Sequence, residues 1–382
     1  MSRRLVTIAT GIGALVALVV MIVLVAIGPG DDGTVGSGGS GPFPTGELTV
    51  ALQDDQLPVV SPQLIPGRID RIVASGAKFT RVDVSWVEVA ASRPVAPRDP
   101  NDPAYVWSRY DAILDGLSAR GVEPIVVFAR TPGWANGDRG PEWAPDGDSY
   151  AAFVRAFALR YSGGAHARVR LFEPWNEPNS PMTLMPQWLD RGPGPSVAVS
   201  PTRYADLLRR AWTEIKAVTP QAYVIGLSLA PVETSAPPVG GVSVTDFIQG
   251  LGTERPPPMD AAAVHIASAA GPNAPSDAIP SFATLPRLVQ EVDRVAPGVP
   301  LLVTQFGEST PPGGLSEADQ ATDLSQSLER FAAVPRIRLA VWFSLQDTAE
   351  RPSGLLRLDG SEKPSWTTFA TGPKTLPSAA GP

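Results

Sequence analysis

The chain lacks cysteine altogether and has only two histidines, His166 and His265, among its 382 residues. Disulfides are therefore excluded, and a thiolate or multi-histidine metal site is not expected. An excess of positive charge is also missing, because 31 Lys and Arg stand against 38 Asp and Glu, a net charge of −7. Nucleic acids select basic surfaces, so no nucleic-acid partner is expected. Neither a cofactor nor a metal is predicted, and carboxylates must carry any chemistry.

A long charge-free apolar run occurs once, at Leu5–Ile27, directly behind Arg3 and Arg4. A signal-peptide core spans only about 7–15 residues, so residues 1–28 are predicted to be a signal anchor that crosses the membrane. The basic flank tends to stay in the cytoplasm. The predicted location is the cell membrane, with a single pass and the folded body outside; small residues at 26–28 leave secretion after signal cleavage as the alternative.

The rest of the chain divides by composition. Residues 29–46 are mostly Gly, Ser, Pro and Asp and are predicted to form a flexible linker. Residues 371–382 are rich in Pro, Ala and Gly and are predicted to be a disordered tail. Residues 47–370 are long enough for one α/β barrel, which takes about 250 residues or more. This body is expected to be a single monomeric domain.

Within the body, short β-rich runs alternate with amphipathic stretches. The predicted strands are Leu48–Gln53, Phe79–Ser85, Val122–Ala129, Val169–Trp175, Ala222–Leu229, Asp260–Ile266, Val299–Gln305 and Ile337–Phe343. The predicted helices include Tyr105–Ala119, Tyr150–Tyr161, Thr202–Val218, Phe282–Val295 and Glu317–Ala333. Strand-then-helix units indicate parallel strands, and this number favours closure into a (β/α)8 (TIM) barrel. A doubly wound open sheet is the alternative, but no Gly-rich phosphate loop follows the first strand.

The active site of such a barrel lies at the carboxyl ends of its strands. The fourth predicted strand ends in LFEPWNEPN at residues 171–179. The WNEP segment resembles the acid/base motif of clan A retaining glycoside hydrolases, the cellulase-like and β-xylosidase-like families. The resemblance implies that Glu177 is the general acid/base and that Asn176 binds a sugar hydroxyl. Partial burial beside Trp175 predicts a raised pKa for Glu177; a plain surface turn is the alternative.

The resemblance extends over most of residues 47–370. Arg81 on the second strand matches an arginine that lies beside the nucleophile in these enzymes, although it could instead form a structural ion pair with Asp83 or Glu123. His265 on the sixth strand matches the family's histidine, but the tyrosine usually found two residues later is Ala267.

Two tryptophans match aromatic platforms for sugar rings. Trp134 follows the third strand in TPGW, where it could equally cover the barrel mouth. Trp342 on the eighth strand resembles the platform at the reacting sugar, with ordinary core as the alternative.

The seventh strand departs from the family pattern, because Gln305 stands where the nucleophilic glutamate is expected. A neutral amide cannot readily form the glycosyl ester of a double displacement. Four explanations remain open: Glu308 has replaced the nucleophile, a 2-acetamido group of the substrate assists, the residue is an engineered substitution, or the barrel binds sugar without catalysis.

The expected function is an extracytoplasmic glycosidase with an impaired nucleophile acting on β-linked oligosaccharides or polysaccharides. The alternative is an inactive glycan-binding protein of the cell envelope.

Overall fold

A computed structural model describes residues 41–252, 254–267 and 271–379. The predicted membrane anchor at 1–28 and most of the predicted linker lie outside these ranges. Among the described residues, none of the helices combines the length and the apolar character needed to span a bilayer.

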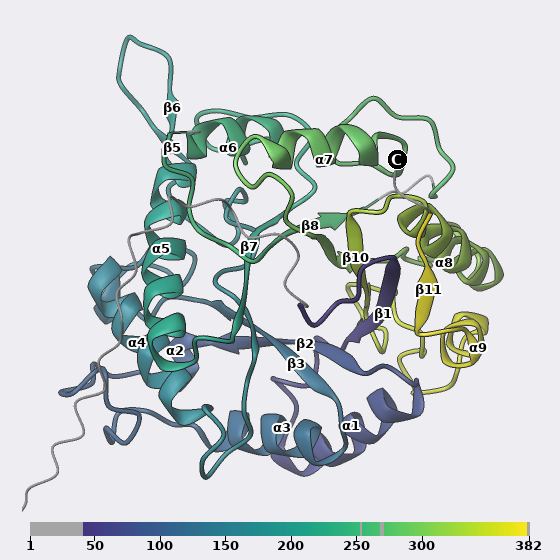
Figure 1. Cartoon of the computed structure of the whole chain (residues 1–382), viewed down its shortest axis with the longest axis horizontal. Helices are drawn as coiled ribbons and strands as arrows, with labels where there is room; N and C mark the ends of the chain where they lie inside the picture. Colours follow the sequence, from purple (N-terminus) through teal and green to yellow (C-terminus); the bar gives the residue numbers. More distant parts are fainter. Residues whose placement is uncertain (1–40, 253, 268–270, 380–382) are drawn as a thin grey trace, which may run out of the picture. The chain divides into compact units, whose positions relative to one another are not determined.

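Eight parallel strands form a closed barrel (Figure 1). They are β1 (Glu47–Gln53), β2 (Phe79–Ser85), β3 (Glu123–Ala129), β4 (Leu171–Glu173), β7 (Tyr223–Leu229), β8 (Ala261–Ile266), β9 (Leu301–Phe306) and β10 (Ile337–Phe343). Each strand pairs with the next in this order, and β10 pairs back onto β1 with Leu52 beside Trp342. The prediction of a (β/α)8 barrel is confirmed, and the open doubly wound sheet is excluded.

Helices surround the strands in a ring (Figure 1). They are α1 (Ile65–Ala74), α2 (Trp86–Val89), α3 (Ser108–Ala119), α4 (Gly147–Arg160), α5 (Ser200–Val218), α6 (Val244–Leu251), α7 (Leu285–Asp293), α8 (Glu317–Ala332) and α9 (Pro364–Thr371). Helices α4, α6 and α8 are each preceded by an N-cap residue: Asp146, Ser243 and Ser316. The side chain of each N-cap accepts a hydrogen bond from the backbone N–H of the residue three positions later. The short helices α1, α6 and α9 are absent from the predicted set.

Strand alternation separates two apolar layers. The lumen is filled by small and branched side chains: Ala51, Ile125, Leu171, Ile225, Ala261, Ala263, Leu302, Leu339 and Val341. Side chains of opposite parity join the larger core between strands and helices. Phe43 closes the amino-terminal end of the lumen, packing 5.3 Å from Phe79 and 6.0 Å from Tyr223. The predicted flexible linker therefore ends before Phe43, because this ring is buried.

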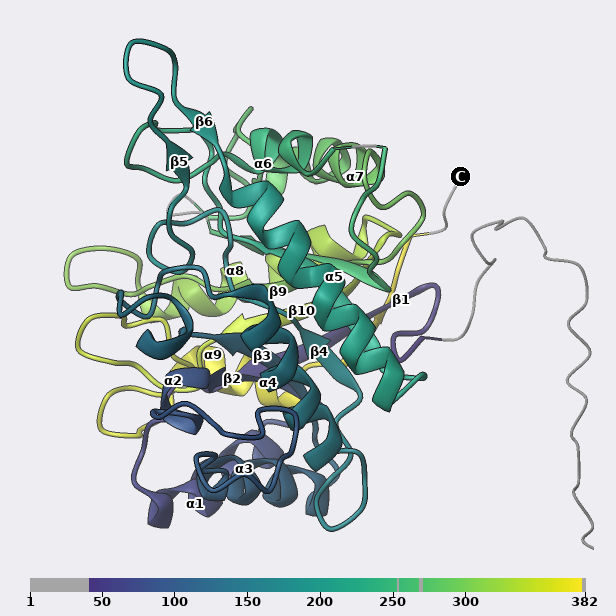
Figure 2. The same ribbon diagram turned by 90° about the vertical axis from the view of Figure 1, so that its left-hand side faces the viewer.

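Two further strand pairings add to the eight-stranded barrel. β11 (Thr375–Pro377) runs antiparallel to β1, so the prediction of a disordered tail from residue 371 is wrong for this segment. The backbone of β11 pairs with the first residues of β1, Glu47 to Thr49. Amino-acid composition alone does not reveal such a pairing. β5 (Trp188–Leu189) and β6 (Val197–Ala198) form a hairpin between β4 and α5. Figure 2 shows this hairpin toward the same end of the barrel as α2, which follows the carboxyl end of β2.

Candidate active site

The chain turns sharply where β4 ends. β4 stops at Glu173, two residues before the predicted end, and Trp175 and Glu177 adopt positive φ values of 104° and 47°. Such backbone costs about 1–3 kcal/mol per residue and is typical of functional sites. The turn sends Trp175 into the outer core, 1% exposed and 5.7 Å from the ring of Tyr150. Asn176 and Glu177 can then both face the barrel mouth, which strict alternation would forbid.

Glu177 is bonded to the buried histidine of β8. The Nδ1 atom of His265 lies 2.7 Å from Oε1 of Glu177, and the two side chains are 3% and 24% exposed. Burial raises the pKa of Glu177, but the hydrogen bond and charge of His265, with the charges of Arg81 and Arg351, outweigh burial and lower it. The prediction of a raised pKa is therefore wrong. Trp175, which was expected to desolvate Glu177, faces the core, whereas positive groups face the carboxylate.

Arg81 links the second and fourth strands. Its Nε and Nη2 atoms donate to the two carboxylate oxygens of Glu173 at 3.1 and 3.3 Å, and its Nη1 donates to Asp83 at 3.1 Å. Nη2 also donates to Oδ1 of Asn176 at 2.6 Å. This contact leaves the Asn176 amide hydrogens for another acceptor. Of the two ion-pair partners considered from sequence, Asp83 is bound, whereas Glu123 pairs elsewhere.

Glu173 is the residue that the sequence analysis missed. Its side chain is 0% exposed and also accepts hydrogen bonds from Ser228 on β7 and from Thr304 on β9, the latter at 3.1 Å. The Ser228 hydroxyl also lies 3.5 Å from Nε2 of His265. A buried polar chain thus runs from Arg81 through Glu173 and Ser228 to the His265–Glu177 pair. A carboxylate on a strand with apolar neighbours is the signal that could have revealed it, since buried charges require partners.

Gln305 lies beside His265. The two residues are in register on β9 and β8, so their side chains share the face that points into the mouth. β9 carries one extra residue between Val303 and Phe306 relative to β10, a bulge that allows both Thr304 and Gln305 to face inward. The structure thus brings Glu177, His265 and Gln305 together at one end of the barrel, with an amide where the resemblance implies a carboxylate.

Glu308 faces a different environment. It follows β9 after Gly307, where an added Cβ would lie 2.3 Å from the backbone oxygen of Phe343. Burial, together with the carboxylate of Asp323 on α8, raises the pKa of Glu308 to about 8. The backbone oxygen of Glu308 is fixed by Gln320, also on α8, at 2.7 Å. Its electrostatic neighbour is thus on the outer helix, which argues against Glu308 as the displaced nucleophile.

The two predicted aromatic platforms lie in different environments. Trp342 is 0% exposed and packs at 5.3 Å against Phe306 in the outer core, so its alternative assignment as core is correct. Trp134 donates its indole N–H to the backbone oxygen of Ala90 at 2.8 Å and packs edge-on at 5.5 Å against Trp86. Trp134 is half-buried on the loop after β3, and its role as a sugar platform stays a prediction.

The aromatic ring of the eighth strand that faces the mouth is Phe343. It is in register with Gln53, whose side chain reaches Arg81 and Asp83 inside the barrel. The guanidinium of Arg351 lies 5.2 Å from the centre of the Phe343 ring. Strand parity, counted from the lumen residue Val341, would have selected Phe343 rather than its neighbour.

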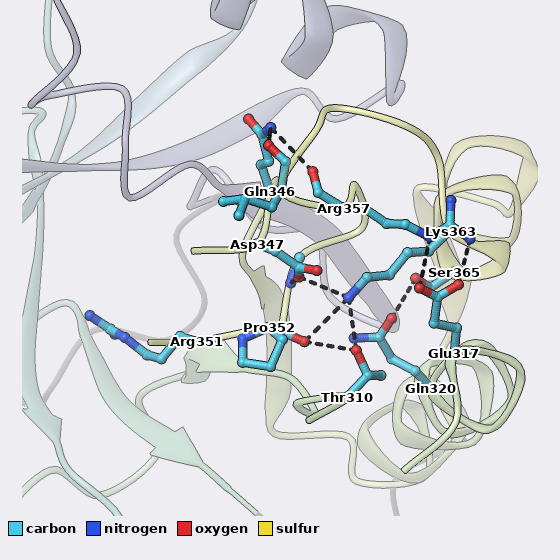
Figure 3. Close-up of polar contacts among 12 residues, drawn as sticks. Thr310, Glu317, Gln320, Gln346, Asp347, Arg351, Pro352, Arg357, Lys363 and Ser365 are labelled. Atoms are coloured by element: carbon cyan, nitrogen blue, oxygen red, sulfur yellow. Dashed lines mark hydrogen bonds and ion pairs between the residues drawn. The ribbon is translucent and has the colours of Figure 1, made fainter. Parts of the chain in front are cut away.

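A polar cluster anchors the loop that carries Arg351 (Figure 3). The ammonium of Lys363, 1% exposed, donates to Asp347 at 2.8 Å, to Thr310 at 2.9 Å and to the backbone oxygen of Pro352 at 3.2 Å. The side chain of Arg351 points away from this cluster in Figure 3. The loop after β10 is therefore tied down on one side while it presents a cation on the other.

A cavity of about 390 Å³ adjoins this site over the carboxyl ends of β1 to β4. Asn176 and Asp83 belong to its lining, whereas Glu177 and Gln305 do not. Burial raises the pKa of Asp83 against the opposing charge of Arg81. No group of three or more His, Cys, Asp or Glu within the described ranges is placed to hold a metal ion.

No protein-family model and no curated protein matches the chain. Solved structures resemble it at low identity. A family 39 glycoside hydrolase from the gut symbiont Bacteroides cellulosilyticus WH2 is 19% identical with a TM-score of 0.59, covering 84% of this chain and 62% of that chain. A monomeric beta-xylosidase from Caulobacter crescentus CB15 is 20% identical with a TM-score of 0.55, covering 85% and 66%.

A GH5_18 protein from Streptomyces cattleya in complex with GlcNAc is 14% identical with a TM-score of 0.60, covering 86% of this chain and 80% of that chain. The chain spans less than two thirds of the length of the two proteins from Bacteroides and Caulobacter. Together with the closed barrel, these likenesses show that the chain has the (β/α)8 barrel fold.

Proposed function

We propose that this protein binds β-linked oligosaccharides or polysaccharides at the barrel mouth and that it cannot hydrolyse them by the double displacement of retaining glycosidases. The observation that carries the proposal is the position of Gln305, in register with His265 on the face that His265 shares with Glu177. Double displacement needs a second carboxylate about 5–5.5 Å from the acid/base, because that oxygen must attack the anomeric carbon. An amide oxygen carries no charge with which to form and stabilise the glycosyl intermediate.

The protonation state of Glu177 also supports binding without double displacement. A general acid must hold its proton near neutral pH to protonate the departing oxygen. The cations that lower the pKa of Glu177 keep it ionised instead. Glu177 therefore acts as a hydrogen-bond acceptor for a bound sugar at neutral pH, and it becomes a proton donor only below its lowered pKa.

Several neighbouring groups can bind a sugar. The amide hydrogens of Asn176 are free to donate, since its oxygen is taken by Arg81. Arg81 and His265 are nearly fully buried and orient Asn176 and Glu177 from beneath. We further propose that residues 1–28 anchor the protein in the cell membrane with the barrel outside, where environmental or cell-envelope glycans are accessible.

Substrate-assisted hydrolysis is a second candidate. In that route the 2-acetamido group of the sugar attacks its own anomeric carbon, and Gln305 orients it while Glu177 protonates the leaving oxygen. The amide at position 305 and the likeness to a structure in complex with GlcNAc favour this candidate. It predicts turnover of acetamido-glycosides alone, rising as the pH falls toward the lowered pKa of Glu177.

Calorimetric titration of the full-length protein with neutral β-linked tetrasaccharides of glucose, xylose and mannose tests the proposal. We expect saturable binding of at least one of them without released product. Asn176→Ala and Glu177→Gln should weaken this binding, whereas Glu329→Gln on the exposed face of α8 should not. Absence of binding to all three sugars, or turnover of aryl β-glycosides at the rate of an ordinary glycosidase, would refute the proposal.

A further inference from the structure

The cavity beside Asn176 is unusual in its charge. Its lining includes the carboxyl groups of Asp55, Asp83, Glu88 and Glu142, against one cationic side chain, Arg130. Of the four carboxylates only Asp83 forms a salt bridge within the described chain, and its partner Arg81 already holds Glu173. Asp55, Glu88 and Glu142 therefore line the cavity without a salt bridge of their own, although the more distant charge of Arg351 acts on Asp55.

Two buried oxygen atoms in the lining also lack partners. The hydroxyl of Ser85, a residue that is 9% exposed, forms no hydrogen bond although Ser85 stands at the first position before α2, where a serine usually caps the helix. Ser85 has the same strand parity as Asp83, so it points to the same side. One carboxylate oxygen of Asp55 is likewise buried and unpaired. Unpaired buried polar atoms cost free energy, and a bound ligand can supply the missing hydrogen bonds.

We infer that this cavity binds a protonated amino group on a sugar, so that the preferred ligand is a β-linked glycan containing unacetylated amino sugars. The inference rests on the proposed glycan-binding function and adds the substrate class. An ammonium group donates three hydrogen bonds and carries the charge that the lining lacks. A volume of about 390 Å³ falls within the range of pockets that hold small organic ligands.

A bare metal ion fits the cavity less well. Metal sites need several oxygen or nitrogen ligands converging at about 2.0–2.6 Å. Within the part of the chain that the structure describes, no three acidic or histidine side chains converge in that way. The carboxylates are spread around the wall, with one each from the segments after β1 and β3 and two from the end of β2 and from α2. That spacing suits a sugar ring with a charged substituent rather than a point charge.

Burial, with the charge of neighbouring Asp54, raises the pKa of Asp55, although the charge of Arg351 and a hydrogen bond with Ser344 oppose the rise. A cation bound in the cavity should lower this pKa again.

The test compares three tetrasaccharides on the full-length protein by calorimetry: β-1,4-linked glucosamine, its fully N-acetylated form and the neutral glucose form. We expect the glucosamine tetramer to bind about tenfold or more tightly than the other two, because charge-assisted hydrogen bonds exceed neutral ones. The double substitution Glu88→Gln and Glu142→Gln should abolish that preference, so that the three tetrasaccharides bind with similar affinity. Glu329→Gln, which removes one negative charge from the remote helix α8, should leave the preference intact.

Equal affinity for all three sugars would overturn the amino-sugar inference and leave the proposed function standing. Retention of the preference in the double variant would also overturn it, since the cavity would then not be its source. Tight binding of calcium chloride alone, lost in the double variant, would identify a metal site instead. Absence of binding to every sugar would refute the proposed function itself.

Discussion

Two glutamates follow strands at the carboxyl end of the barrel, and their environments are opposite. Glu177, after β4, is hydrogen-bonded to His265 and lies in the field of Arg81 and Arg351, so its pKa is lowered despite burial. Glu308, after β9, is buried beside Asp323, and its pKa rises to about 8. Proximity to a strand end does not decide what a carboxyl can do; the charges around it do.

The contrast extends to the two sides of the barrel mouth. The side formed by β2, β4, β7 and β8 keeps a continuous chain of buried polar partners around Glu173 and Glu177. The side formed by β9 and β10 presents Gln305 and Phe343, and Glu308, a buried acid that follows β9, is coupled electrostatically to Asp323 on helix α8. The two sides of the mouth therefore differ in their polar groups: one has a buried network of charged side chains, and the other presents a neutral amide and an aromatic ring.

Removing the cation at the centre of the polar side should have the largest effect on stability. Arg81→Met leaves Glu173 buried without its counter-charge, and breaking one partner of a buried pair costs about 3–5 kcal/mol. Arg170→Met removes an arginine that is 62% exposed from its pair with Glu123 and should cost less than about 1 kcal/mol. Urea unfolding of both variants measures the difference; equal losses would show that the network around Glu173 contributes little.

Glu308 should make the protein less stable at high pH. Its folded pKa of about 8 lies above the unfolded value, so the stabilisation by the protonated form is complete below about pH 4 and is lost as the pH rises through 8. Glu308→Gln should therefore raise the free energy of unfolding relative to wild type by up to roughly 4 kcal/mol at pH 9 and by little at pH 4. Unfolding curves at the two pH values check this; a constant difference would contradict the assigned burial.

The smallest effect concerns the pKa of Glu177 itself. His265→Ala removes the hydrogen bond and the charge interaction that oppose burial, so this pKa should rise. His166→Ala, at the other histidine, removes a contact with Asp115 and should leave Glu177 unchanged. Carbon-detected NMR titration of the glutamate carboxyls distinguishes the two variants, and an unshifted Glu177 in His265→Ala would show that another group lowers its pKa.

The barrel was predictable from sequence because the strands are compact apolar runs that alternate with longer helical stretches. The WNEP segment, Arg81 and His265 were likewise visible, because their residue types are unusual at strand ends. The resemblance also located Gln305, and the register confirms its position next to His265.

The failures have different physical origins. Positive φ values at Trp175 and Glu177 turn the indole into the core, and the pKa of Glu177 is lowered because the hydrogen bond and charge of His265, with the charges of Arg81 and Arg351, outweigh burial. A difference of one position in parity decides that Phe343 rather than Trp342 faces the mouth. The role of Glu173 depends on partners from β2, β7 and β9, which no local pattern reveals.

The most direct test of the missing nucleophile is the hydrolysis of aryl β-glycosides by Gln305→Glu, with the anomeric configuration of the product followed by NMR. The new carboxylate supplies the attacking oxygen, and its negative charge raises the pKa of Glu177 toward that of a working acid. We predict that wild type is nearly inactive and that Gln305→Glu gains at least about 10²–10³-fold in rate with retention of configuration, whereas the shorter Gln305→Asp gains far less. Rapid hydrolysis by wild type, unaffected by Gln305→Ala, would contradict the account.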